Sequence, residues 1–307
     1  MHRLLRVRWV LGLIAPLVVA ELALRVLAPS LPSPEPWPSV GLEVKSDYAE
    51  RLVGEDVDVL ILGSSVSEAG IDPDLLLDRH GISAFNAAGP FSTPIGMQRW
   101  LDHSLWPLDP DTMLIGLSIW GAPEGRADDV LANGLDTVAA HAQEADNWFL
   151  GRSDFWARRS QLRNPFDLLN DSVNASAYTP RGHNTYYEGQ TRASEATTDD
   201  GAPFPGFSKD NETALGDIIA AAGEQGIRVV LLLEPGGCPS VLPDCANADS
   251  EDRALEAVED LARRYDVALI NGRAIETPDH WYADSAHFNE IGAAAFTEFV
   301  ATELGSL

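Results

Sequence analysis

The sequence predicts an α/β protein in which helices cover both faces of a parallel sheet, a three-layer α/β/α sandwich. Short apolar runs rich in β-branched residues alternate along the chain with longer segments whose apolar residues recur at helical spacing. The runs are almost continuously apolar, which is typical of parallel strands buried on both faces. This alternation implies a sandwich around one parallel sheet. At 307 residues the chain can bury one such core together with an insertion.

Five runs are predicted to be the strands of this sheet. In chain order they cover 57–62, 84–86, 113–118, 227–233 and 267–271. The first helix is expected to start with Asp72 as its N-cap and Pro73 at the first helical position, and to close at Gly81. Further helices are expected at 213–223, at 251–265 and, capped by Asn289, at the C-terminus.

The N-terminal segment, 1–28, is expected to anchor the chain in a membrane. Several arginines precede an apolar run, 9–28, that can span a hydrocarbon core of about 30 Å at about 1.5 Å per residue. Glu21 and Arg25 lie four residues apart and can pair near its outer end. The arginines mark the cytoplasmic side, so a single-pass protein with its main domain outside the cytoplasm is expected. The alternative is a cleaved signal peptide with its apolar run at 9–19, which gives a secreted protein.

Two further segments depart from the α/β rhythm. Prolines crowd the start of 29–50, so this segment is expected to be a stiff, non-helical spacer between the anchor and a catalytic domain at 51–307. Within that domain, 121–210 is rich in aromatic residues and too long for an ordinary connection. It is interpreted as an insertion that covers the carboxyl edge of the sheet and shapes a binding surface. Alternatively, its aromatic residues only form a small core of their own.

The charge of the chain excludes one class of partner. The formal net charge is -26, from 47 acidic and 21 basic side chains. A nucleic-acid backbone would be repelled by such a field, so no nucleic acid is expected as a partner. The acidic excess is spread along the chain and is interpreted as a solubilising surface. Protein partners cannot be inferred from the sequence.

The chain has two cysteines, Cys238 and Cys245, on either side of a short loop. In an oxidising compartment such a pair is expected to form a local disulfide. Two unpaired thiols are the alternative. Two ligands are too few for a zinc site, so no metal is expected there.

Serine chemistry is suggested first by the residues that follow the first predicted strand. Ligands of parallel α/β sheets bind beyond the carboxyl ends of the strands. Gly63, Ser64 and Ser65 stand at that place, where exposed amides at a helix start can stabilise an anion. Serine is a weak nucleophile without a base, so this segment is insufficient alone.

A matching acid and base stand between the last predicted strand and the last helix, at the same edge of the sheet. His287 can accept and return a proton near neutral pH, since its ordinary pKa is about 6.5. Asp284 lies three residues earlier and can orient the imidazole ring. Ser65, Asp284 and His287 are therefore the predicted catalytic triad.

Two of these segments resemble the signature motifs of a known enzyme family. Gly63-Ser64-Ser65 resembles the first signature block of SGNH/GDSL hydrolases, with Ser64 where an aspartate is usual. Residues 284–287 match the last block, including its continuation to Gly292. The anchor and the insertion are most similar to the membrane-associated branch that includes alginate O-acetyltransferase-like proteins. The resemblance implies a flavodoxin-like fold and ester chemistry without a metal or an organic cofactor.

The same resemblance indicates an incomplete oxyanion hole. The family usually adds to the nucleophile amide a glycine amide from its second block and an asparagine from its third. Here the second-block donor is Gly89 or Phe91 depending on registration. No asparagine stands in the third block, where Ser118 is the candidate, and the alternative is a donor from the insertion. Ser65, Gly89 and Ser118 are therefore the expected donors. Losing one donor costs about 10²- to 10³-fold in rate.

Together these features predict a serine-dependent ester hydrolase or O-acyl (acetyl) transferase working through an acyl-serine. The expected substrate is an acylated cell-surface glycan or a small ester. The alternative is a surface protein of the same fold that binds glycan without turnover.

Overall fold

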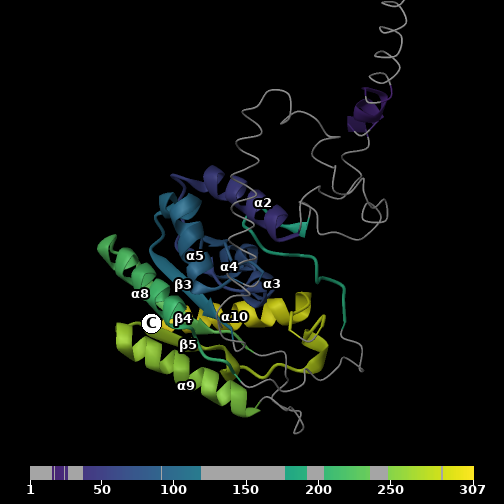
Figure 1. The fold of residues 1–307 in the computed structure, drawn as a ribbon. Coiled ribbons are helices and arrows are strands. Elements are labelled where there is room, and N and C mark those ends of the chain that lie inside the picture. The colour runs from purple at the N-terminus through teal and green to yellow at the C-terminus, as the bar shows by residue number, and fades with distance from the viewer. Residues whose placement is uncertain are drawn as a thin grey trace, which may run out of the picture.

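The computed structural model of the chain describes residues 16, 18–23, 25–26, 37–90, 92–118, 177–191, 204–235, 248–284 and 286–307. These residues contain a five-stranded sheet in the order β2-β1-β3-β4-β5 (Figure 1). The strands are β1 (Val59–Leu62), β2 (Ala84–Asn86), β3 (Thr112–Leu117), β4 (Arg228–Leu233) and β5 (Ala268–Asn271). Every neighbouring pair is parallel. The predicted parallel sheet is confirmed, with strand boundaries that move by no more than a few residues.

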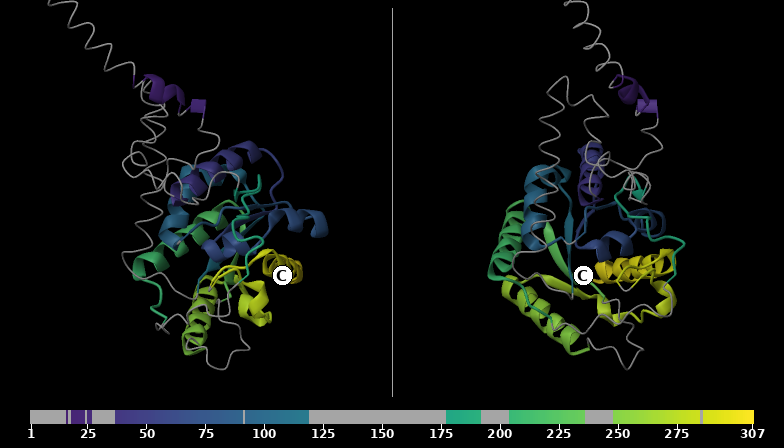
Figure 2. Two further views of the ribbon diagram at one scale, coloured as in Figure 1. Left: turned by 90° about the vertical axis from the view of Figure 1, so that its right-hand side faces the viewer. Right: turned by 45° about the vertical axis from the view of Figure 1, so that its right-hand side comes forward.

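Helices cover both faces of the sheet, as Figures 1 and 2 show. The α-helices are α2 (Trp37–Leu52), α3 (Ser65–Gly70), α4 (Pro73–His80), α5 (Pro94–Trp100), α8 (Lys209–Glu224), α9 (Ala248–Tyr265) and α10 (Glu290–Ser306). The described residues also form a π-helix (Leu101–Leu105) and 3₁₀ turns at Trp106–Leu108, Gly272–Ala274 and Asp279–Trp281, and residues 18–23 near the N-terminus are helical.

Alternate residues of each strand enter two separate cores. In β1, Leu60 and Leu62 pack with side chains of α2, α5, α8 and α9, while Val59 and Ile61 pack with those of α4 and α10. Successive side chains of a strand point to opposite faces, so one apolar run serves both cores. The three-layer arrangement follows from these two cores.

Helix boundaries follow the capping residues that the sequence provides. The Asp72 carboxylate accepts hydrogen bonds from the amides of Asp74 and Leu75, and Gly81 closes α4 with a left-handed φ of 69°. Asn289 caps α10 as predicted. Helix α8 begins at Lys209 instead of 213, because the Ser208 hydroxyl accepts from the Asn211 amide and caps an earlier start.

The prediction of a non-helical spacer over 29–50 is wrong from residue 37 onward. Helix α2 covers Trp37–Leu52, and its Leu42 and Ala49 are buried in the core it shares with α5. The prolines end at Pro38, which lies in the first turn of the helix, where a missing amide proton breaks no intrahelical hydrogen bond. A helix can therefore start within the proline-rich stretch. Residues 29–36 lie outside the described part.

Several other predictions fall wholly or partly outside the described residues. Cys238, Cys245 and Phe91 lie outside the described residues. Of the insertion, 121–210, the structure describes 177–191 and 204–210. In the N-terminal segment, the Arg25 guanidinium donates to the Glu21 carboxylate at 2.7 Å, which is the expected pairing. Among the described residues, no helix combines the length and apolar character needed to cross a bilayer.

Candidate active site

The turn after β1 places Ser65 at the carboxyl edge of the sheet. Gly63 and Ser64 follow the strand, and α3 starts at Ser65. The Ser64 hydroxyl caps this helix by accepting a hydrogen bond from the Val66 amide at 3.1 Å. Strand β1 has β2 on one side and β3 on the other, so the turn lies where the strand order reverses, the usual ligand position in such sheets.

The structure brings the three predicted triad side chains together. His287 Nε2 lies 2.8 Å from Ser65 Oγ, and His287 Nδ1 lies 2.8 Å from Asp284 Oδ2. Both distances are within the reach expected of a nucleophile–base and a base–orienter hydrogen bond. Two segments from opposite ends of the domain therefore meet in a serine–histidine–aspartate arrangement.

A tight turn fixes the acid against the base. Asp284 Oδ1 accepts hydrogen bonds from the backbone amides of Ala286 and His287, both at 2.8 Å. The ends of the turn are tied by the bond from the Ala283 amide to the His287 carbonyl at 2.9 Å. Burial alone would raise the pKa of Asp284, but the hydrogen bonds and charge of His287 and the two amides hold it below its usual value. The carboxylate therefore stays ionised and can orient the imidazole.

The 177–191 segment of the predicted insertion reaches this site. The Tyr187 ring stacks on the His287 ring with centroids 4.3 Å apart and an interplanar angle of 10°. Tyr187 is buried, and burial raises the pKa of its hydroxyl, so the phenol stays neutral. Tyr187 is one of many aromatic residues in the predicted insertion, and the sequence pattern gives no signal that it contacts the base.

A buried carboxylate lies beneath the nucleophile turn. Glu234 follows β4, and its Oε1 accepts from the Ser64 amide at 3.0 Å, the Ser67 amide at 3.2 Å and the Ser67 hydroxyl at 2.5 Å. Its Oε2 accepts from the Ser64 hydroxyl at 2.6 Å. Burial raises the pKa of Glu234, and these hydrogen bonds oppose the rise. Glu234 directly follows the predicted strand 227–233 in the sequence.

A buried ion pair holds α3 from another side. Lys45 of α2 lies 3.0 Å from the Glu68 carboxylate and donates to the Ala88 carbonyl at 2.5 Å. The Asn184 side-chain amide donates to the other Glu68 oxygen at 3.1 Å. Helix α2, helix α3 and the 177–191 segment are thereby joined through one carboxylate.

Of the expected oxyanion donors, Ser65 stands at the start of α3, and the Gly89 amide is already hydrogen-bonded. The Ser65 amide occupies the first position of α3, where an intrahelical acceptor is not available. The Gly89 amide already donates to the Gly63 carbonyl at 3.0 Å, because the turns after β2 and β1 are hydrogen-bonded together. The prediction of Gly89 as an open donor is therefore wrong. Ser118 follows β3 at the same edge of the sheet.

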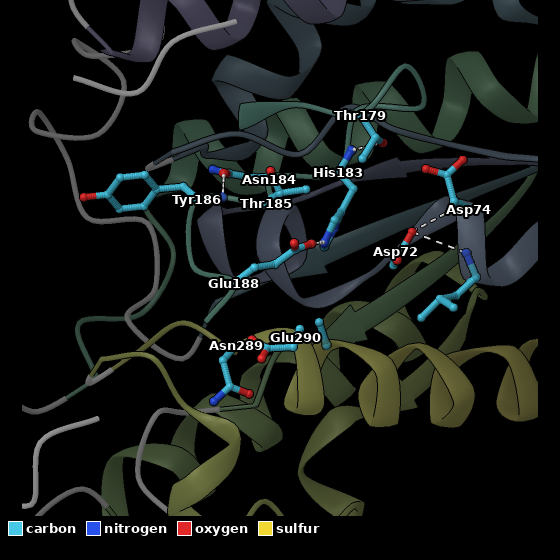
Figure 3. Close-up of polar contacts among 12 residues, drawn as sticks. Asp72, Asp74, Thr179, His183, Asn184, Thr185, Tyr186, Glu188, Asn289 and Glu290 are labelled. Atoms are coloured by element: carbon cyan, nitrogen blue, oxygen red, sulfur yellow. Dashed lines mark hydrogen bonds and ion pairs between the residues drawn. The ribbon is translucent and has the colours of Figure 1, made fainter. Parts of the chain in front are cut away.

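The 177–191 segment also contains a buried histidine (Figure 3). His183 is 3% exposed, and its Nε2 lies 4.0 Å from the Glu188 carboxylate. Its Nδ1 has no hydrogen-bond partner among the described residues. Burial lowers the pKa of His183, and the charge of Lys45 adds to this, while Asp72 and Glu188 oppose it. The ring is therefore neutral in the folded protein at neutral pH.

Acidification should destabilise the fold through His183. An ordinary histidine titrates near pH 6.5 in the unfolded chain, and the pKa of His183 is lower in the folded one. Its contribution to stability is complete above pH 6.5 and is lost as the pH falls through the folded pKa, with a slope of up to about 1.4 kcal/mol per pH unit. Denaturant titrations of wild type and His183→Gln between pH 8 and pH 5 measure this. A difference between the two proteins that stays constant with pH would contradict it.

Among the described residues, no three His, Cys, Asp or Glu side chains lie close enough together to form a possible metal site. What the described geometry defines is a parallel α/β domain with a serine–histidine–aspartate site at its carboxyl edge.

No protein-family model matches the sequence, and no curated protein sequence matches it. Solved structures with a similar arrangement include a putative acylhydrolase from Bacteroides fragilis, at 11% identity and a TM-score of 0.42, covering 84% of this chain and 94% of that one. A GDSL-like lipase from Bacteroides thetaiotaomicron has 11% identity and a TM-score of 0.42, covering 86% and 98%. A catalytic variant of an acetylxylan esterase from Geobacillus stearothermophilus has 12% identity and a TM-score of 0.43, covering 80% and 93%. At these low similarities, inference about function rests on the site itself.

Proposed function

We propose that this protein is a serine-dependent ester hydrolase or O-acyl transferase of the SGNH/GDSL type. The observation that carries the proposal is the continuous hydrogen-bonded chain from Ser65 through His287 to Asp284, with both links at 2.8 Å. A nucleophile, a base and an orienting acid in this order are what acyl transfer through serine requires.

The proposed reaction has two acyl-transfer steps. The Nδ1–H of His287 donates to Asp284, which leaves Nε2 free to accept the Ser65 hydroxyl proton. Ser65 Oγ then attacks the ester carbonyl carbon, and His287 returns the proton to the departing alcohol oxygen. The acyl-serine reacts with water in hydrolysis or with an acceptor hydroxyl in transfer, and the attacking group gives its proton to His287 as its oxygen bonds the carbonyl carbon. The proton returns to Ser65 when the acyl group leaves.

The negative charge that develops on the carbonyl oxygen needs hydrogen-bond donors. The Ser65 amide at the start of α3 is the proposed first donor. Ser118, which follows β3 at this edge, and the amide of Phe91, which comes shortly after β2 in the sequence, are the proposed further donors. A site with fewer than three donors would be slow or specialised, because each donor contributes about 10²- to 10³-fold to rate.

The proposed setting is the outer side of a membrane, with the 9–28 run as a single-pass anchor or, alternatively, a cleaved signal. The proposed substrate is an acylated glycan of the cell surface or a small ester. The arginines before the apolar run and the Arg25–Glu21 pair at its far end support this orientation. The position of Tyr187 over His287 supports a role for the insertion in shaping the acyl site.

Product analysis tests the activity and separates its two forms. The domain without the N-terminal run is incubated with an acetylated oligosaccharide, with and without an unmodified polysaccharide acceptor, and the products are identified by mass spectrometry. Free acetate in both samples indicates a hydrolase, whereas acetylated acceptor indicates a transferase. Glycan binding without release or transfer of acetate would refute the proposal and favour a binding protein of the same fold.

Tyr187→Leu should lower kcat by about tenfold and leave KM less affected. The ring covers one face of the His287 imidazole, and a stacked aromatic pair contributes about 0.5–1.5 kcal/mol beyond the area it buries. Tyr187→Phe keeps the ring and should retain most of the activity. Steady-state kinetics of both variants measure this. Equal losses in the two variants would show that the hydroxyl, and not the stacked ring, is what matters.

A further inference from the structure

We propose that Glu234 is a positioning residue for the nucleophile: a buried carboxylate at the end of β4 that fixes the turn carrying Ser65. The inference rests on the proposed function, since it concerns how that function's nucleophile is held. Glu234 acts on Ser65 indirectly, through its hydrogen bonds to the residues that flank it.

The contacts of Glu234 enclose the nucleophile on both sides. Ser64 precedes Ser65 and Ser67 follows it after one residue, and both donate an amide and a hydroxyl to the same carboxylate. Glu234 and Ser67 are fully buried, and Ser64 nearly so. Because water does not reach these groups, the carboxylate is the partner that satisfies them. The first turn of α3 therefore has its position set by a residue from another strand.

Two glycines leave space for the Glu234 side chain to extend past β3 towards the turn after β1. In the strand order, β3 lies between β4 and β1, so the Glu234 side chain must pass the end of β3. A Cβ atom at Gly116 of β3 would lie 2.6 Å from Glu234 Oε1, and one at Gly63 would lie 2.9 Å from the same oxygen. Real Cβ atoms do not approach so closely. Glycine at both positions leaves the space that the carboxylate occupies.

The backbone of Glu234 is itself fixed. Its amide donates to the Leu117 carbonyl at 3.0 Å, which continues the pairing of β4 with β3 beyond the last strand residue. A rigid sheet thus holds the carboxylate, and the carboxylate holds the turn. A displacement of about 1 Å at a reacting group can cost about 10²-fold in rate, so loss of this support should be visible in the kinetics of Ser65.

Two substitutions distinguish the hydrogen bonds from the space that the side chain fills. Glu234→Met has a similar length and accepts no strong hydrogen bond, so the amides of Ser64 and Ser67 lose their partner. Glu234→Gln keeps one oxygen for the three bonds to Oε1, and its amide can donate to the Ser64 hydroxyl. We expect kcat to fall by about 10²-fold in Glu234→Met with KM changed by less than about threefold, and to recover to within about tenfold of wild type in Glu234→Gln.

The experiment measures kcat, KM and the rate at which a fluorophosphonate probe labels Ser65, with near-ultraviolet circular dichroism to check folding. Leu232→Ala is the matched control, since Leu232 lies on the same strand and packs in the core on the α10 face. It should lower the melting temperature while kcat stays within about twofold of wild type. Should Glu234→Met fail to fold, Ser67→Ala removes one of the four hydrogen bonds and should slow labelling several-fold in a folded protein.

The outcomes separate this inference from the proposed function. Folded Glu234→Met that labels at the wild-type rate overturns the positioning role, and so does a loss of kcat in Leu232→Ala as large as the loss in Glu234→Met. If Glu234→Met does not fold, a wild-type labelling rate in folded Ser67→Ala overturns it as well. A wild-type protein that neither reacts with the probe at Ser65 nor turns over ester refutes the proposed function instead.

Discussion

Replacing Ser65 with alanine will reduce ester turnover by about 10⁴- to 10⁶-fold and leave the fold intact. Ser65 Oγ is the atom that forms the acyl bond, and its hydrogen bond to His287 is the link through which it is activated. Replacing His287 with alanine should have an effect of the same order, because the two groups act as a unit. Asp284→Asn should cost somewhat less, about 10⁴-fold, since it leaves the nucleophile and base in place.

Steady-state kinetics of the single variants and of the triple variant measure these effects. The triple variant should be about as slow as Ser65→Ala alone, since residues that act as a unit do not contribute additively. Ser306→Ala, at the exposed end of α10, is the control and should keep wild-type activity. Turnover in Ser65→Ala within about tenfold of wild type would contradict the assignment of the nucleophile.

Replacing Lys45 with methionine will destabilise the folded protein by about 3–5 kcal/mol. The substitution leaves the Glu68 carboxylate, which is part of α3, buried without its cation. The double variant Lys45→Met, Glu68→Met removes both charges and should recover most of the loss. Denaturant unfolding of the two single variants and the double variant measures the coupling between the residues.

An exposed ion pair provides the comparison for this prediction. Arg264 and Glu212 join α9 to α8 at 2.6 Å with both side chains partly in water, so Arg264→Met should cost much less stability than Lys45→Met. A cost below about 1 kcal/mol for Lys45→Met, or a double variant whose loss equals the sum of the single ones, would show that the buried pair is not coupled as described.

The sheet was predictable because buried parallel strands have a strong local signal. Each strand is an almost continuous apolar run, and the predicted and observed boundaries of β2 coincide. The capping residues Asp72 and Asn289 likewise act within a few residues of their own positions. Helix α2 was missed because its fold depends on distant packing of Leu42 and Ala49, while the nearby prolines give the stronger local signal.

The triad was predictable for a different reason. In a parallel sheet every strand ends at the same edge, so topology brings the residues after the first and last strands to that edge. The turn that holds Asp284 against His287 is short enough to read from their spacing. Predicting the three triad residues therefore required only the assumption that these two segments meet at one edge of the sheet.

The support around the triad could not be predicted in the same way. Lys45, Glu68 and Glu234 are charged residue types that are usually exposed, and their burial depends on partners far away in the sequence. The Gly89 amide illustrates the same limit, because the neighbouring turn decides its hydrogen-bond partner. Tyr187 is one of many aromatic residues in the insertion, and its stacking on His287 depends on how that segment returns to the sheet.

Identifying the labelled residue tests the proposed nucleophile most directly. The purified domain is treated with a fluorophosphonate probe and digested, and the modified peptide is located by mass spectrometry. We predict a single adduct on the Ser65 hydroxyl, absent from Ser65→Ala and formed far more slowly in His287→Ala. An adduct on another residue, or equal labelling of Ser65→Ala and wild type, would contradict the proposed site.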